Sequence, residues 1–228
     1  MKNRAAVSGE GGTWQRRKDA RPGEILAAAR ALLEAEGTLD LPVARIAAAA
    51  GVSEATVYKY FSGKQGLIDR VLLEWAMPLI DTLTTELPRL PDLRAQLAAV
   101  ARNYLRSMGE TPRLHQLFYQ ELRWTNYRGS PLHQLNQRLS TMLGDCLQAA
   151  VDRGELCADL DLTMVRDMLF GGLEHIAMRT SLIGRPLAVN EEAARYVSMM
   201  MTGLAPRPAL AELNAVVARL GALVEGNG

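Results

Sequence analysis

Apolar residues recur every three or four positions along most of the chain, with polar residues between them. This spacing places apolar side chains on one face of an α-helix, and we see no strand-like alternation. Proline and glycine divide the pattern into segments of helical length. We therefore predict an all-α protein. The predicted helices cover about 22–37, a segment beginning at Pro42, 54–60, a segment beginning near Gly63, 91–108, 112–126, 132–153, 162–183, 190–203 and 209–224.

Two short helical patterns meet at a tight turn within Val43–Leu72. Gly51 lies in the turn, where a glycine can adopt a positive φ. Ser53 follows, and its hydroxyl can accept the backbone N–H of Thr56 and so cap the second helix, 54–60. Two helices joined in this way form a helix-turn-helix, in which the second helix enters the major groove of DNA.

The same stretch resembles the DNA-binding domain of the TetR family of bacterial regulators, whose pattern is I-A-x-x-A-G-V-S-x-x-T-[VL]-Y-x-[HY]-F-x-x-K-x-x-L. The matching residues are Ile46, Ala47, Ala50, Gly51, Val52, Ser53, Thr56, Val57, Tyr58, Tyr60, Phe61, Lys64 and Leu67. The resemblance implies nine to ten helices, with a C-terminal helical domain that binds a ligand and dimerises. We expect a flexible basic arm at 1–20, the helix-turn-helix DNA-binding domain at 21–66, and the effector-binding and dimerisation domain at 67–228.

The resemblance also implies which side chains meet double-stranded DNA. They are Arg45, Ser53, Glu54, Ala55, Thr56, Tyr58, Lys59, Tyr60 and Lys64. Lys59 occupies a position that approaches base edges and can donate to guanine, whereas Lys64 matches a frequent phosphate contact. Glu54 has two interpretations of equal weight: it accepts from a cytosine amino group, or it only favours the positive end of the helix dipole.

Composition and charge refine this picture. Hydrophobic residues make up 48% of the chain and aromatic residues 5%, a balance that favours packed helices over a sheet sandwich. The net charge is +1, yet residues 1–64 carry ten Lys and Arg against seven Asp and Glu. The cluster of Arg16, Arg17, Lys18 and Arg21 can contact phosphates or enter a minor groove, or it can be a solvated tail.

A single short reading helix buries little surface, so two copies related by a twofold axis are expected to read a palindromic operator as a homodimer. By resemblance the dimer face lies at about 163–182 and 191–204. Its apolar residues are Val165, Met168, Leu169, Leu173, Ile176, Val197, Met200 and Met201. Gly171 and Gly172 indicate a close helix approach or a local bend. Packing within one subunit is the alternative for the whole stripe.

The domain that follows the reading head, our name for the helix-turn-helix domain at 21–66, contains large, adaptable side chains with a few polar groups. The candidate ligand-binding residues are Trp75, Tyr104, Met108, His115, Phe118, Tyr119, Trp124, Met142 and Phe170. Such a set can line a pocket for a small, largely apolar or acyl-type effector, although core packing also explains each residue taken alone. Pro78 offers a kink through which an effector can swing the reading heads apart and release DNA.

Other functions have weaker support. His115, His133 and His175 form no H-E-x-x-H pair, and no phosphate-binding glycine loop or nucleophile elbow is present, so we expect no enzyme, metal or cofactor. Cys146 and Cys157 do not form a disulfide framework. A redox-responsive regulator acting through these cysteines is one alternative, and a helical interaction module without specific DNA binding is another. No apolar run is long enough to span a membrane, so we expect a cytoplasmic protein, most simply a repressor.

Overall fold

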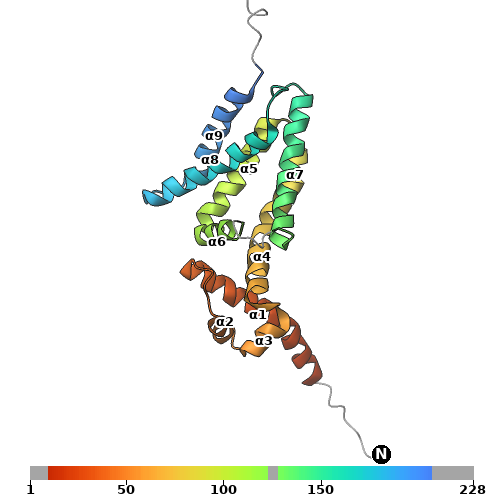
Figure 1. The fold of residues 1–228 in the computed structure, drawn as a ribbon, viewed down its shortest axis with the longest axis vertical. Helices are drawn as coiled ribbons and strands as arrows, with labels where there is room; N and C mark the ends of the chain where they lie inside the picture. Colours follow the sequence, from red (N-terminus) through yellow and green to blue (C-terminus); the bar gives the residue numbers. More distant parts are fainter. Residues whose placement is uncertain (1–9, 123–127, 207–228) are drawn as a thin grey trace, which may run out of the picture. The chain divides into compact units, whose positions relative to one another are not determined.

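The computed structural model describes residues 10–122 and 128–206, and within these ranges all regular structure is helical. This confirms the predicted all-α class. A 3-10 turn at Leu87–Arg89 accounts for the predicted break at the prolines that follow α4. The helices are α1 (Glu10–Glu36), α2 (Val43–Ala49), α3 (Glu54–Tyr60), α4 (Gly63–Glu86), α5 (Leu93–Glu110), α6 (Pro112–Leu122), α7 (Pro131–Asp152), α8 (Leu162–Leu182) and α9 (Val189–Leu204) (Figure 1). The predicted helix 209–224 and Trp124 lie outside the described residues.

The predicted start of the first helix at Pro22 is wrong, because α1 already begins at Glu10 and Pro22 lies inside it. Proline removes one helical hydrogen bond, but the good helix formers Arg16, Arg17, Lys18 and Ala20 precede it and favour a helix that continues through this position. Helix α1 therefore extends over residues 10–20, which we assigned to the flexible arm. Residues 1–9 lie outside the described part of the chain.

The chain divides into two compact units. The first unit combines Met1–Leu83 with Arg106–Leu139, and the second combines Thr84–Leu105 with Ser140–Gly228. Helices α4, α5 and α7 contribute residues to both units.

The core of the first unit supports the helix-turn-helix from several sides. The largest of its buried side chains are Ile25 and Leu33 from α1, Leu41 from the following loop, Ile46 from α2, Leu67 and Leu72 from α4, and Leu114 and Leu117 from α6. Burying one leucine or isoleucine completely contributes about 2 kcal/mol. Helix α3 joins this core through Val57, which is 1% exposed. The recognition helix is thus anchored by one face while its other faces stay open.

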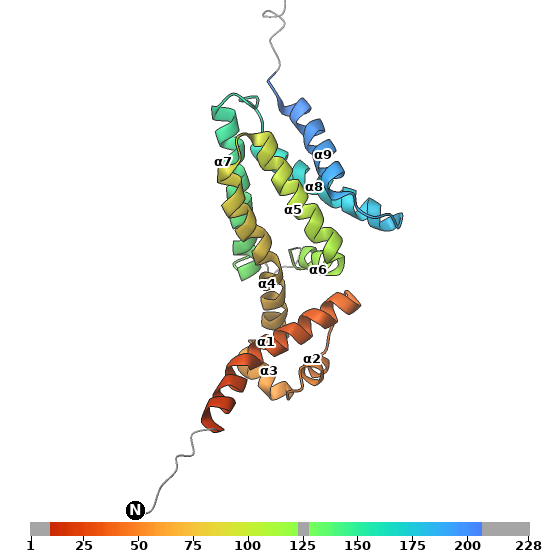
Figure 2. The ribbon, with the colours of Figure 1, turned by 180° about the vertical axis from the view of Figure 1, so that it is seen from behind.

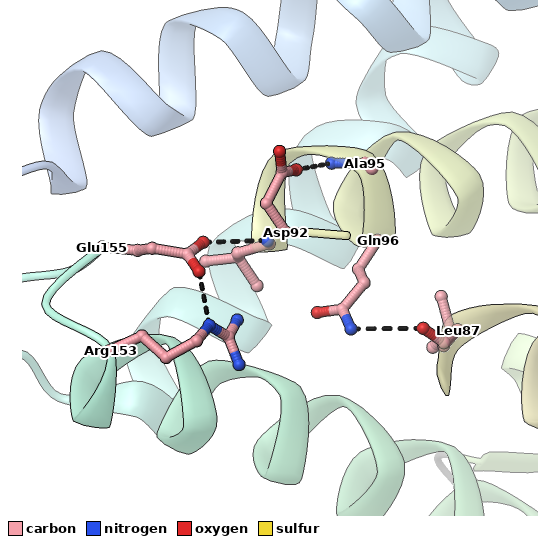
Figure 3. A network of polar contacts seen from close by, with 7 residues as sticks. Leu87, Asp92, Ala95, Gln96, Arg153 and Glu155 are labelled. Carbon is pink, nitrogen blue, oxygen red and sulfur yellow. Dashed lines mark hydrogen bonds and ion pairs between the residues drawn. The ribbon is translucent and has the colours of Figure 1, made fainter. Parts of the chain in front are cut away.

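In the second unit, the N-terminus of α5 is held by a polar network (Figure 3). Asp92 accepts the backbone N–H of Ala95 at 2.7 Å, which caps the helix. Glu155 accepts the backbone N–H of Leu93 at 2.9 Å and the Nε–H of Arg153 at 2.5 Å. The hydrogen bond from Arg153 is the main reason that the pKa of Glu155 lies below its usual value. The network fixes the α7–α8 loop to the start of α5.

Helices α8 and α9 lie side by side in the second unit (Figures 1 and 2). The Tyr196 hydroxyl of α9 donates to the backbone carbonyl of Met168 in α8 at 2.5 Å. A side chain at Gly172 would collide with the Tyr196 ring, whereas one at Gly171 would meet nothing within 4 Å. The expected close helix approach is therefore found at Gly172, within one subunit.

Several residues predicted for the dimer face are instead buried within the second unit. These are Val165, Leu169, Leu173, Val197, Met200 and Met201, each at most 9% exposed. They form the contact between α8, α9 and the rest of the unit, which is the intrasubunit alternative. Met168, in contrast, is exposed. The exposed fractions are 56% for Met168, 56% for Met164 and 52% for Met178.

Candidate DNA-binding interface and effector site

The turn between α2 and α3 has the geometry that its sequence predicts. Gly51 adopts a φ of +64°, a left-handed conformation that favours glycine. Ser53 is the N-cap of α3, and its Oγ accepts the backbone N–H of Thr56 at 3.2 Å. The two hydroxyl groups also lie 2.8 Å apart within hydrogen-bonding distance. The predicted bounds of the recognition helix and its predicted cap are both confirmed.

The outer face of α3 carries the side chains expected to meet bases. Glu54, Ala55 and Lys59 are exposed, and Tyr58 is 54% exposed although it is a large aromatic residue. Such exposure is unusual for tyrosine in a core, so packing alone does not account for Tyr58. The structure therefore brings the predicted base-contacting residues together on one accessible surface.

The two predicted backbone-contacting cations are paired with carboxylates. Lys64 Nζ lies 3.2 Å from Asp40 Oδ1. Arg45 donates to both carboxylate oxygens of Glu36, at 2.9 and 2.6 Å. Neither acid was among the predicted site residues, because the pairs join positions 9 and 24 residues apart and no local pattern reveals them.

Helix α6 contacts the two helices on either side of the helix-turn-helix, α1 and α4, in the first unit. Arg113 donates from Nη1 to the backbone carbonyls of Glu34 and Ala35. These carbonyls belong to the last turn of α1, where carbonyl groups have no hydrogen-bond donor within the helix. At the other end of α6, Glu121 accepts from the amide Nε2 of Gln65 in the first turn of α4 at 2.8 Å. Burial raises the pKa of Glu121, opposed by this hydrogen bond. These hydrogen bonds connect α6 to α1 and α4, the helices on either side of the helix-turn-helix.

An aromatic cluster joins α4 and α6 in the same unit. The ring centroids of Trp75 and His115 lie 5.8 Å apart, as do those of Trp75 and Phe118. His115 and Tyr119 are 5.0 Å apart. Trp75 Nε1 also donates to the Thr111 hydroxyl at 2.8 Å. Four of the predicted ligand-binding residues therefore come together on these two helices.

Burial dominates the chemistry of His115. The side chain is 6% exposed, and desolvation lowers its pKa from 6.5 to about 4. At neutral pH the imidazole is therefore uncharged. An uncharged ring among aromatic side chains suits an apolar surrounding rather than an anionic ligand.

The remaining predicted ligand-binding residues have separate surroundings. In the second unit the Tyr104 and Phe170 rings lie 5.2 Å apart, and Met142 Sδ lies 3.8 Å from the Thr84 hydroxyl. Met108 is half-buried in the first unit.

The family model of the bacterial regulatory proteins of the tetR family matches residues 25–71, the segment that contains the capped turn and α3. Residues 25–71 of this chain therefore match the DNA-binding domain of the TetR family. The resemblance stated from the sequence is confirmed, and with it the function of a DNA-binding transcriptional regulator with a helix-turn-helix.

Relatives match over most of the chain. The HTH-type transcriptional repressor KstR2 of Rhodococcus jostii (strain RHA1) is 25% identical over 194 residues, which cover 82% of this chain and 93% of that protein. The fatty acid metabolism regulator protein of Bacillus subtilis (strain 168) is 24% identical over 152 residues, or 66% of this chain and 78% of that protein.

A solved structure shows the same fold. The transcriptional regulator FadR from Bacillus subtilis, in complex with stearoyl-CoA, superimposes with a TM-score of 0.69 at 20% identity. The match covers 79% of this chain and 98% of that chain. The similarity of fold thus extends well beyond residues 25–71.

Other chemistry finds little support in the described residues. Cys146 and Cys157 are free thiols, and burial raises the pKa of Cys146, which reduces its reactive thiolate form. In residues 10–122 and 128–206, no three His, Cys, Asp or Glu side chains gather as metal ligands would. Among the helices of those same ranges, none is both long and apolar enough to cross a membrane.

Proposed function

We propose that this chain is a repressor that binds a palindromic operator as a homodimer and is released by a small, largely apolar effector. The observation that carries the proposal is the capped, outward-facing recognition helix α3, anchored by Val57 and presenting Tyr58 and Lys59. A helix held in this way can enter a major groove without losing contact with its core. The proposal includes the roles assigned to three segments: a basic arm at 1–20, the DNA-binding domain at 21–66, and the effector-binding and dimerisation domain at 67–228.

The predicted DNA contacts have two chemical classes. Glu54, Ala55, Tyr58 and Lys59 face base edges, where hydrogen bonds and apolar contacts distinguish sequences. The phosphate class consists of Arg45, Ser53, Thr56, Tyr60 and Lys64, whose hydroxyl, ammonium and guanidinium groups fix the position of the protein on the duplex.

Dimerisation is supported by an exposed stripe along α8 that contains three methionines. Met164, Met168, Gly171, His175 and Met178 are spaced by four, three, four and three residues, and all are exposed. This alternation is the heptad spacing that one helix uses to pack along another. Soluble chains seldom expose such a row of methionines without a partner surface. A second copy related by a twofold axis supplies the same stripe and places two reading heads on the two half-sites.

The effector proposal is supported by the aromatic cluster of Trp75, His115, Phe118 and Tyr119, which suits an apolar or acyl ligand. Within the first unit, an effector that displaces α6 also acts on α1 through Arg113. Because the binding of effector and operator is linked, the operator weakens effector binding by the same factor. The stearoyl-CoA bound by the FadR relative makes long-chain acyl thioesters the first compounds to test.

Selection of bound sites from random DNA tests the proposal directly. We expect an enriched palindrome whose half-sites lie about one helical turn, or a multiple of it, apart. A panel of acyl thioesters is then screened by thermal shift, and every compound that stabilises the chain is added to the operator complex. Absence of any enriched sequence contradicts DNA reading. A stabilising compound that leaves operator affinity unchanged contradicts the release mechanism alone.

A further inference from the structure

The loop between α1 and α2 places a carboxylate beside the first turn of α4. Asp40 Oδ1 lies 3.2 Å from Lys64 Nζ, with side-chain exposures of 99% for Asp40 and 36% for Lys64. Ion pairs this exposed contribute little to folding stability, because solvent and salt screen them and two long side chains lose freedom. Stability therefore does not account for the pair.

The backbone around Asp40 is held in place, so the position of its carboxylate is not accidental. Leu41 is 0% exposed and Leu39 packs partly buried against the same core. The backbone N–H of Asp40 donates to the Thr38 hydroxyl at 3.1 Å. With its neighbours anchored inward, the Asp40 side chain stands outward, within reach of Lys64.

Lys64 is also unusual for its place in a helix. It is the second residue of α4, where the helix dipole disfavours a positive charge. Its side chain is therefore not placed there to stabilise the helix. A lysine that tolerates this position fits a role in binding an external anion, which under the proposed function is a DNA phosphate.

We propose that Asp40 is an affinity-limiting residue, whose carboxylate competes with DNA phosphate for Lys64 and weakens binding to every duplex. The proposal rests on the proposed function, specifically on Lys64 meeting the DNA backbone. When phosphate takes the ammonium group, the carboxylate loses its partner and lies within a Debye length of the phosphate, about 10 Å at 0.1 M salt. Both effects oppose binding. Glu36 stands in the same relation to Arg45, which it holds at 2.6 and 2.9 Å.

The test compares wild type with Asp40→Asn on the selected operator and on an unrelated duplex. We expect the variant to bind both about two- to five-fold more tightly at 0.1 M salt, the range expected for exposed ion pairs. The plot of log affinity against log salt should become steeper, but by less than about 0.9 for each Lys64, because wild-type Lys64 already neutralises part of one phosphate and the variant completes this contact. The ratio between the two affinities should stay unchanged.

Two comparisons separate competition from a general change of charge. Glu74→Gln removes the same charge from an exposed pair in the same helix, Arg70 with Glu74 at 2.7 Å, and should change DNA affinity less than Asp40→Asn does. In a Lys64→Ala background, the gain from Asp40→Asn should fall by at least half. An equal gain in both backgrounds overturns competition and leaves only a field effect of the carboxylate.

The outcomes distinguish this proposal from the one on which it rests. If wild type selects no sequence, DNA reading itself fails. If wild type selects a palindrome and Lys64→Ala weakens binding, but Asp40→Asn binds no more tightly, only the affinity-limiting role is overturned. Thermal unfolding of the Asp40→Asn protein should match wild type. If the Asp40→Asn protein unfolds at a different temperature from wild type, Asp40→Ser serves as a second neutral variant, because it keeps a short polar side chain. Its affinities for the same two duplexes then test the proposal.

Discussion

Two lysines near the reading head differ in what their surroundings prepare them to do. Lys59 lies in the last turn of α3 on the exposed side, among the residues that face bases. Lys64 lies at the start of α4, half-buried and held by Asp40. A contact to a base edge carries sequence information, and a contact to phosphate carries almost none. The two residues should therefore fail in different ways when they are truncated.

Lys64→Ala should weaken binding to the operator and to unrelated duplexes by a similar factor and reduce the salt slope by up to about 1. Lys59→Ala should instead change which bases are preferred, by about 1–3 kcal/mol at one position of each half-site. Salt-titrated binding to a panel of operator variants measures both effects. A Lys64→Ala protein with unchanged affinity and unchanged salt slope contradicts the phosphate contact.

The buried imidazole of His115 should make folding depend on pH. Its pKa is lowered to about 4 in the folded chain, so the unfolded chain binds the proton more readily between about pH 6.5 and pH 4. The free energy of unfolding should accordingly fall as the pH drops through this window, by about 3 kcal/mol at most. His115→Leu should lack this component, while His133→Gln should retain it.

Urea unfolding at a series of pH values provides the measurement. Burial raises the pKa of Glu121, an effect of the opposite sign, so the comparison between wild type and His115→Leu isolates the histidine. Parallel pH profiles for the two proteins are the result that excludes a buried neutral His115.

At the scale of single elements, the recognition helix could be predicted from sequence because its signals are local. Gly51 marks the turn, Ser53 the cap, and Val57 the inward face, all within seven residues. The start of α1 could not be predicted in the same way. Pro22 is a strong local signal for a helix start, but the helix-forming segment before it prevails.

Pairings between distant residues lay beyond sequence patterns altogether. The contact of Arg113 with the C-terminus of α1 joins residues almost 80 positions apart, and no repeat or motif in the sequence predicts it. The dimer stripe shows a related limit. Helical spacing identified α8 as apolar, but only packing decided that Leu169 and Leu173 face inward while Met164 and Met178 remain exposed.

Gly172 should be indispensable to the pairing of α8 with α9. Gly172→Ala places a methyl group where the Tyr196 ring lies, so α9 must shift and the hydrogen bond from Tyr196 to Met168 is strained. We expect a loss of about 1–3 kcal/mol in the free energy of unfolding, which is typical of overpacking. Thermal or denaturant unfolding measures it.

Gly144→Ala is the matched control, because Gly144 also lies within a helix but an added methyl group there meets nothing within 4 Å. That substitution should stabilise the chain by about 0.5–1 kcal/mol through helix propensity alone. Equal effects of the two substitutions would mean that Tyr196 does not need the space at Gly172.

At the scale of the whole molecule, the α8 stripe should decide the oligomeric state. Met168→Arg introduces a charge on a face that is proposed to meet its own symmetry copy, where two arginines would oppose each other. We expect the variant to sediment as a monomer and to lose operator binding at least ten-fold, since one head alone reads only a half-site. Thr141→Arg, on an exposed position of α7, should do neither.

Analytical ultracentrifugation over a range of protein concentrations provides the measurement, and circular dichroism verifies that each variant keeps its helices. A Met168→Arg protein that remains a dimer places the twofold contact on another face.

The core that supports the helix-turn-helix draws on Leu114, Leu117 and Leu132, far along the chain from α1 to α4. This has a practical bearing on synthetic biology. A chimera that joins only residues 1–66 to a foreign ligand-binding domain would leave an apolar surface exposed to solvent, and such a surface promotes aggregation. The transplantable cassette is larger and discontinuous, comprising Met1–Leu83 together with Arg106–Leu139. Engineers seeking new biosensors from this chain would do better to redesign the lining of its own sensor than to graft its head elsewhere.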